Sequence, residues 1–312
     1  MGWIALTLFY GIVKGAREIV KKKALELSTV MEVLFFYTLI GFLLLLPEAG
    51  HVWGMTPKMY LLVAVKSFVI FVAWLCGFYA IKRIPVSVYG VLDLSRVLFS
   101  TTLGVIVIGE QPGMLQNVGM CLVISGLVLL GLRKDRKTKK TKAEEVPPEG
   151  TAADLPEETG GRTERKPFRE SMPCFVILAF LSAFLNAVSG TMDKVLTIRV
   201  GITSAQLQFW YMLYLLVFYG LFIVAARTPV RVKQTAKNYW IWILSILFIA
   251  ADRALFIANS YPESRVTVMT LLEQAGAVVT IVAGRFVFHE KGTAYKLLCA
   301  GVIVAGIVLG TI

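Results

Sequence analysis

Two acidic residues inside apolar segments are the strongest chemical signal in this sequence. Asp93 and Glu273 stand 180 residues apart, and each follows two apolar residues. An ionisable side chain within a membrane segment costs about 2.5–3.5 kcal/mol on insertion scales, so it persists where it faces water, a partner or a substrate. Burial favours the neutral form of a carboxylate, so one of the two could also carry a proton. The pair predicts a site for a small-molecule substrate, with protons as a further partner.

Arg96 lies three residues after Asp93 and therefore on the same face of a helix. The two could neutralise each other locally, or they could present both charge signs to a zwitterion such as an amino acid. The matching position of Glu273 favours the second interpretation, because two related halves would bring both acids to similar depth on opposite walls. Gln274, beside Glu273, could bind substrate or join two helices through its amide.

A second group of candidates surrounds an adjacent pair of opposite charges. Asp252 and Arg253 cannot point the same way, so at least one needs a partner on another helix. Asp252 aligns with Trp74 at a slightly different interval, and Lys66, eight residues earlier, shares the face of Trp74. Lys66 and Trp74 could form a cation and aromatic platform for an anionic or aromatic group, or they could be interface anchors.

Four weaker candidates complete the predicted site. Lys14 and Lys194 also stand 180 residues apart, late in the first helix of each half, where a topology anchor and a cavity residue are equally good interpretations. Asn186 and Tyr211 lie within apolar segments, where packing is an alternative. The substrate-binding prediction comprises Lys14, Lys66, Trp74, Asp93, Arg96, Asn186, Lys194, Tyr211, Asp252, Arg253, Glu273 and Gln274.

The segments that carry these residues are expected to be membrane helices. The chain has 312 residues, of which 57% are hydrophobic and 17% charged, whereas a soluble domain has about 25% charged residues. An apolar helix needs about 20 residues to cross a bilayer, and a helix satisfies its own backbone there. Ten segments qualify, at roughly 2–20, 30–47, 58–80, 85–108, 113–132, 173–192, 203–226, 237–258, 262–288 and 292–311. The predicted fold is all-α and membrane-embedded.

The ten segments fall into two halves of five, residues 1–132 and 173–312. Between them, residues 133–172 are rich in Lys, Glu, Pro and Gly and hold too few apolar residues to offset the entropy of ordering. We expect a charged, disordered tether, either a plain linker or a functional tail. Because each half has an odd number of helices, the second half should be inverted relative to the first, around a central cavity.

Other residues that recur between the halves are expected to serve the fold. Glu110 and Glu290 precede the last helix of each half, where an acid meets the positive end of a helix dipole. Small residues allow membrane helices to approach closely. The glycines expected to do so are Gly119, Gly126, Gly301, Gly306 and Gly310.

We attribute the net charge of +12 to contact with membrane lipids and not to nucleic-acid binding. Basic residues gather between segments 1 and 2, between 3 and 4, between 7 and 8, and in the tether, beside apolar segments where they meet anionic lipid headgroups. The positive-inside rule then places the tether in the cytoplasm beneath a plasma membrane, with both termini outside. Outside the tether the basic residues are Arg17, Lys21, Lys22, Lys23, Lys82, Arg83, Arg227, Arg231, Lys233 and Lys237.

Several short motifs join this pattern. They are Ala80–Ser87, Leu103-Gly104, Gly109-Glu110, Gly119, Gly126, Ser189–Lys194, Pro262, Gly284, His289-Glu290 and Gly306. Together they resemble the EamA-type branch of the drug/metabolite transporter superfamily. The resemblance implies ten helices in two inverted repeats, with segments 1, 3, 4, 6, 8 and 9 lining the path and segments 5 and 10 peripheral. It also implies movement of small metabolites such as amino acids, often as export, and termini in the cytoplasm, opposite to the charge count.

No enzyme or cofactor motif accompanies these features. The sequence has no GxSxG, no Walker sequence and no metal-ligand spacing, so we expect neither an enzyme nor a bound cofactor. Without a nucleotide-binding domain, transport must use a gradient. The predicted function is a secondary transporter of small polar metabolites, with export as the expected direction. The alternative is a non-transporting membrane scaffold or sensor that acts through the tether.

Overall fold

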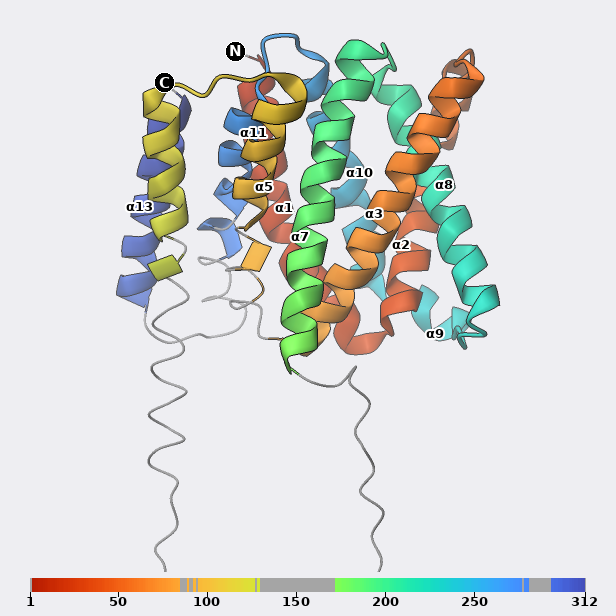
Figure 1. The fold of residues 1–312 in the computed structure, drawn as a ribbon. Coiled ribbons are helices and arrows are strands. Elements are labelled where there is room, and N and C mark those ends of the chain that lie inside the picture. The colour runs from red at the N-terminus through yellow and green to blue at the C-terminus, as the bar shows by residue number, and fades with distance from the viewer. Residues whose placement is uncertain are drawn as a thin grey trace, which may run out of the picture.

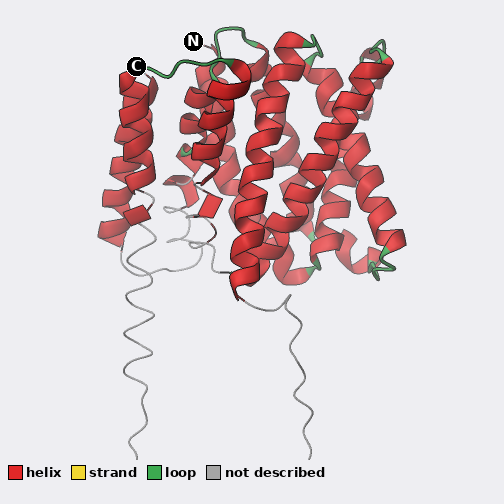
Figure 2. Ribbon diagram, viewed as in Figure 1, coloured by secondary structure: helices red, strands yellow, loops and turns green. Residues whose placement is uncertain are grey.

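Every regular element that the structure describes is a helix, as Figure 2 shows, which confirms the all-α prediction. The tether prediction lies outside the described residues except at Met172, and the predictions for Gly284, His289 and Glu290 lie outside them as well. The computed structural model describes residues 2–84, 89, 92–93, 95–126, 128–129, 172–276, 278–280 and 293–311.

The described helices follow the predicted segments closely in both halves (Figure 1). Those of the first half are α1 (Gly2–Leu27), α2 (Val30–Leu45), α3 (Pro57–Arg83), α5 (Ser95–Leu103) and an unlabelled helix over 114–126. Those of the second half are α7 (Met172–Lys194), α8 (Ser204–Ala225), the short α9 (Val232–Ala236), α10 (Tyr239–Ser260), α11 (Val266–Glu273) and α13 (Thr293–Thr311). A 3₁₀ turn, Leu46–His51, extends α2, and π-helical turns at Gly104–Ile108 and Val195–Arg199 extend α5 and α7.

Five of these helical stretches are long and apolar enough to cross a membrane, which makes the chain a multi-pass membrane protein. The five stretches are Val30–His51, Pro57–Arg83, Cys174–Arg199, Ser204–Ala225 and Tyr239–Ser260. Shorter apolar helices accompany them at Ser95–Ile108, Met114–Gly126 and Gly301–Gly310. The full set of ten spanning helices goes beyond this finding and stays a prediction.

Local sequence explains where the second helix of each half begins. Thr29 precedes α2 and Thr203 precedes α8, and each side chain accepts a hydrogen bond from the backbone N–H three residues later. The side chains of Glu32 and Gln206 accept in return from the cap backbone, so both helices begin with a capping box. This reciprocal bonding satisfies donors that a helix start leaves unpaired.

The first helix is longer than the sequence indicates. The prediction ended it near residue 20, whereas α1 continues to Leu27, so the basic cluster assigned to a connection lies within a helix. Arg17 and Lys21 find partners inside the protein, Asp252 of α10 and Glu18 of α1. Because these charges are paired, they do not end the helix.

The two halves pack against each other through corresponding helices. The first helix of the first half, α1, packs most extensively against α10, the third spanning helix of the second half. The first helix of the second half, α7, packs likewise against α3. The contact of α5 with α7 has its counterpart in the contact of α11 with α1. The halves are therefore interleaved, and the helices that carry the candidate residues meet at their interface.

The last helices of the two halves cross at glycines, away from the candidate residues. A Cβ built on Gly119 would lie 2.6 Å from the carbonyl oxygen of Gly306, and one on Gly306 would lie 2.7 Å from that of Gly119. The prediction of close contact is confirmed for these two, and for Gly126 and Gly310, which are similarly crowded. It is wrong for Gly301, which has open space where its Cβ would stand.

Both chain ends lie at the same end of the bundle in Figure 1, and α9 lies at the opposite end. Arg231, which precedes α9, pairs with Glu32 at the start of α2, so the basic connection is fastened to that end. The termini and these basic residues thus lie at opposite ends, which agrees with the prediction from the positive-inside rule that they face opposite sides of the membrane. The compartment that each end faces stays a prediction.

Candidate functional site

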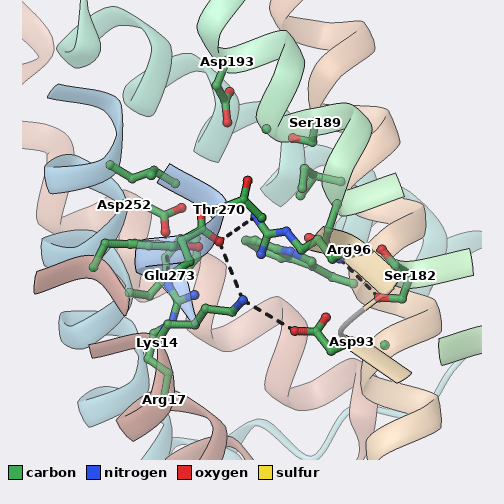
Figure 3. A pocket seen from close by; sticks show the side chains of 18 of the residues that line it. Lys14, Arg17, Asp93, Arg96, Ser182, Ser189, Asp193, Asp252, Thr270 and Glu273 are labelled. Atoms are coloured by element: carbon green, nitrogen blue, oxygen red, sulfur yellow. Dashed lines mark hydrogen bonds and ion pairs between the residues drawn. The ribbon is translucent and has the colours of Figure 1, made fainter. Parts of the chain in front are cut away.

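A cavity of about 120 Å³ lies between the two halves, in the middle of the bundle (Figure 3). This volume accommodates several water molecules or a small polar solute. Its walls come mainly from α1, α3, α5, α7, α10 and α11, and no described residue of α13 or of the helix over 114–126 contributes. Nine of the twelve predicted site residues line it, namely Lys14, Lys66, Trp74, Asp93, Arg96, Asn186, Tyr211, Asp252 and Glu273.

Lys14 of α1 joins the two acids that the repeat singled out. Its ammonium lies 3.5 Å from Asp93 Oδ2 and 3.8 Å from Glu273 Oε2 (Figure 3). Arg96 reaches across from α5, and its guanidinium lies 3.2 Å from Glu273 Oε2. Asp93 and Arg96 thus each pair with another helix and not with each other. The expected juxtaposition of Asp93 and Glu273 is present, with a lysine between them.

Arg17 of α1 forms a second ion pair, with its guanidinium 3.1 Å from Asp252 Oδ1 of α10. The same guanidinium lies 4.9 Å from the ring centroid of Phe248, within cation–π range. Sequence reasoning assigned Arg17 to membrane orientation and missed this role. Helical spacing could have found it, because Tyr10, Lys14 and Arg17 recur every three or four residues and therefore share a face.

Lys66 of α3 forms the third pair, with its ammonium 3.0 Å from Asp193 Oδ1 of α7. Its aromatic neighbours are Tyr211, 3.6 Å from the ammonium to the ring centroid, and Phe256, at 4.8 Å. The predicted partner, Trp74, lies instead against the rings of Tyr37 and Phe248 (not Lys66). Asp193 was not among the predicted site residues, because its partner Lys66 lies far away in the sequence, on a helix of the other half.

Asn186 also lines the cavity, and its amide donates 2.8 Å to the backbone oxygen of Ser182 on its own helix.

Three predicted site residues do not line the cavity, and two of them are Gln274 and Arg253. Gln274 donates to the backbone oxygen of Thr270 at 3.1 Å, so its amide bonds within its own segment. Arg253 points away from Asp252, as their adjacency requires, and bonds Gln208 of α8 and Glu48 of the 3₁₀ turn.

The third residue outside, Lys194, clamps the turn between α10 and α11. Its ammonium donates 2.8 Å to the backbone oxygen of Tyr261 and also bonds Ser264. From the other side, the carboxylate of Glu110 accepts bonds of 3.0 Å from the backbone and side chain of Thr267. Glu110 therefore sits at the start of α11, in the opposite half, and not at its own following helix. Both charges suit the helix ends that they meet.

Family comparison agrees with this arrangement of helices and charges. Residues 1–132 match the model of the EamA-like transporter family. The matched stretch is the first of the two halves, 132 of the 312 residues. The family lies within the drug/metabolite transporter superfamily, so the resemblance drawn from the motifs is confirmed. The function that this match suggests is membrane transport of the drug/metabolite type.

Solved structures also match this chain. Twenty-seven of their chains match. One, described as the crystal structure of a protein, aligns with a TM-score of 0.65 at 13% identity, covering 99% of this chain and 98% of that one. At this identity the likeness concerns the fold alone. No curated protein matches the sequence.

Several buried polar atoms that make no hydrogen bond lie around the cavity. Among the described residues, five buried side-chain atoms make no hydrogen bond: Glu18 Oε2, Arg96 Nε, Asp193 Oδ1, Glu273 Oε2 and Tyr219 Oη. The first four belong to residues that line the cavity. Buried polar atoms in proteins are nearly always bonded to protein, water or ligand. Two of the four cavity atoms, Asp193 Oδ1 and Glu273 Oε2, are already engaged in ion pairs with Lys66 and Arg96. The unused capacity for hydrogen bonds therefore lies with Arg96 Nε and Glu18 Oε2.

The ion pair between Glu32 and Arg231 shows the contrast with a pair that serves the fold. Both oxygens of Glu32 accept backbone hydrogen bonds, one from Thr29 at 2.8 Å and one from Arg231 at 2.9 Å. The Arg231 guanidinium adds two further bonds. A buried charge is tolerated when such bonds satisfy it. The cavity pairs lack this support.

Proposed function

We propose that this protein is a secondary transporter of small polar metabolites, with amino acids as the class that its cavity suits best. The observation that carries the proposal is a cavity between the halves in which cations and carboxylates meet with unused hydrogen-bonding capacity. A zwitterion brings one group of each sign. Arg96 and Lys14 suit its carboxylate, Glu273 suits its ammonium group, and Asp93 holds Lys14 in place between them.

The transport cycle is alternating access by two inverted five-helix halves. In support, the main contacts between the halves occur in exchanged pairs, with α1 against α10 and α7 against α3. Such paired contacts let one half rock against the other around a site that keeps its place. Movement is driven by the gradient of the substrate or of protons, with Asp93 and Glu273 as proton carriers.

Export is the direction that the cavity favours. Its lining follows α1 from Tyr10 to Lys21, towards the end that carries the basic residues. At the other end, Lys194 and Glu110 anchor the turn between α10 and α11 by hydrogen bonds. A conformer of this kind receives substrate from the basic side, which the positive-inside rule assigns to the cytoplasm.

Transport by purified protein in liposomes tests the proposal. We expect Asp93→Asn and Glu273→Gln each to reduce amino-acid counterflow by about tenfold or more, because Glu273 meets the ammonium group and Asp93 holds the lysine that meets the carboxylate. The pH dependence of transport should also change. Glu48→Gln is the matched control, since Glu48 pairs with Arg253 outside the cavity. Unchanged rates and pH profiles in both cavity variants would exclude these acids as site or proton carriers.

A further inference from the structure

The charges that line the cavity are divided between the halves by sign. The first half contributes five cations and two carboxylates, a formal net charge of +3, from Lys14, Arg17, Lys21, Lys66, Arg96, Glu18 and Asp93. The second half contributes three carboxylates, Asp193, Asp252 and Glu273, a formal charge of −3. No cation comes from the part of the second half that the structure describes. The cavity is thus neutral in total but strongly polar across the interface.

Every ion pair that crosses the cavity between the halves has the same polarity. Arg17 reaches Asp252 at 3.1 Å, and Lys66 reaches Asp193 at 3.0 Å. Glu273, on the second half, pairs with Arg96 at 3.2 Å and with Lys14 at 3.8 Å. In each case the cation belongs to the first half and the acid to the second.

Outside the cavity the polarity between the halves is reversed. Arg231 of the second half pairs with Glu32 of the first, and Arg253 of the second half pairs with Glu48 of the first. The division of charge is therefore a property of the cavity, not of the two halves as wholes.

We propose that this polarity orients the substrate. A zwitterion lies with its carboxylate against Arg96 and Lys14 of the first half and its ammonium group against Glu273 and Asp252 of the second. In binding, it replaces ion pairs that otherwise join the halves. The inference rests on the proposed function and adds to it which half binds the carboxylate and which binds the ammonium group.

The physical reason is the cost of unpaired charge. When the halves move apart within the membrane, a pair such as Arg96 and Glu273 must separate, and each member is left in a medium of low polarity. A zwitterion supplies a carboxylate to one and an ammonium group to the other. An amine or an acid alone supplies only one, so the remaining charge is unpaired. The cavity should therefore prefer zwitterions over molecules that carry either group alone.

Calorimetric binding to the purified full-length protein tests this orientation. The probes are phenylalanine and leucine, each with its matching amine (phenethylamine, isoamylamine) and acid (3-phenylpropionate, 4-methylvalerate). The rings of Trp74 and Phe248 on the cavity wall suit such side chains. The wild-type protein should bind a zwitterion about tenfold or more tightly than its amine or acid.

The two variants should lose different preferences. Arg96→Gln removes one of the carboxylate's two partners, so the zwitterion's advantage over the amine should fall, while its advantage over the acid persists. Glu273→Gln should do the reverse. The neutral double variant Arg96→Gln/Glu273→Gln avoids an unpaired buried charge and should lose both preferences. Glu48→Gln, outside the cavity, should keep both.

Each outcome decides a separate point. If the zwitterion binds to the wild type but Arg96→Gln and Glu273→Gln reduce the two preferences equally or in reverse, the orientation is wrong and the proposed function stands. If neither zwitterion binds to the wild type, the amino-acid class in the proposed function fails, and the orientation fails with it.

Discussion

Each buried charge of the cavity depends on a specific partner, as Lys66 and Asp193 show. Lys66 is only 2% exposed and Asp193 only 5%. Such a pair contributes little net stability, because its attraction is offset by the loss of hydration, but either member left alone is a buried, uncompensated charge. The two residues should therefore be strongly coupled.

We expect Lys66→Met to lower the free energy of unfolding by about 3–5 kcal/mol, because Asp193 is left unpaired. Adding Asp193→Asn should restore most of the loss, since the double variant buries no charge. Unfolding of the detergent-solubilised protein by heat and by denaturant measures both. If the double variant were as unstable as Lys66→Met, the two residues would not act as a pair.

Adjacency and helical spacing predict several side-chain directions but not their partners. The divergence of Asp252 and Arg253 could be predicted, because neighbouring residues leave a helix in different directions. The partner of Asp252 could not, since Arg17 lies 235 residues away in sequence. From the sequence, Arg17 was assigned a role in orienting the protein in the membrane, because a basic residue near the end of an apolar segment usually has that role.

Among the elements, α1 has the strongest influence on the shape of the cavity, and glycines set its distance from α11. A Cβ on Gly11 would lie 2.8 Å from the backbone oxygen of Leu272, and one on Gly276 would lie 2.5 Å from that of Gly11. A Cβ on Gly15 would overlap the backbone oxygen of Gly276. The two backbones are nearly in contact, which brings the lysine between Gly11 and Gly15 to the acid of α11.

Gly15→Ala should push α1 from α11 and destabilise the protein by about 1–3 kcal/mol, as overpacking does in cores. Transport should fall as well, because Lys14 moves away from Glu273. Gly301→Ala is the control, since nothing lies within 4 Å of its Cβ position. That change should be neutral or stabilise by about 0.5–1 kcal/mol. Thermal unfolding and counterflow of both variants provide the comparison, and equal effects would contradict the packing argument.

For the whole molecule, the distribution of basic residues and the position of the termini make one topological prediction. Both termini lie at the end opposite α9 (Figure 1), and Arg227, Arg231, Lys233 and Lys237 surround α9. The positive-inside rule retains such residues in the cytoplasm, because their transfer across the membrane is disfavoured.

A compartment-sensitive reporter fused after Ile312 should therefore signal the outside, and the same reporter inserted after Arg227 should signal the cytoplasm. Both fusions should keep transport, which serves as the control for folding. A cytoplasmic signal from the fusion at Ile312 would overturn the orientation, and it would agree with the arrangement usual in the superfamily.

The sequence by itself determined the membrane helices, the boundaries of most of them and the two acids of the repeat. These follow from local properties, since the length of an apolar run decides whether a helix crosses a bilayer, and capping residues such as Thr29 and Thr203 mark where a helix begins. The resemblance to the EamA-type family was also readable from short motifs, and the family match over residues 1–132 confirms it.

Only the tertiary structure decided which charges meet. Lys14 meets Glu273 because α1 packs against α11, and Lys66 meets Asp193 because α3 packs along α7. Pairing energy depends on distances of a few ångströms and on burial, which are set by how helices from opposite halves pack. The same packing gave the cavity its polarity, because cations spread over three helices of one half meet acids spread over three helices of the other.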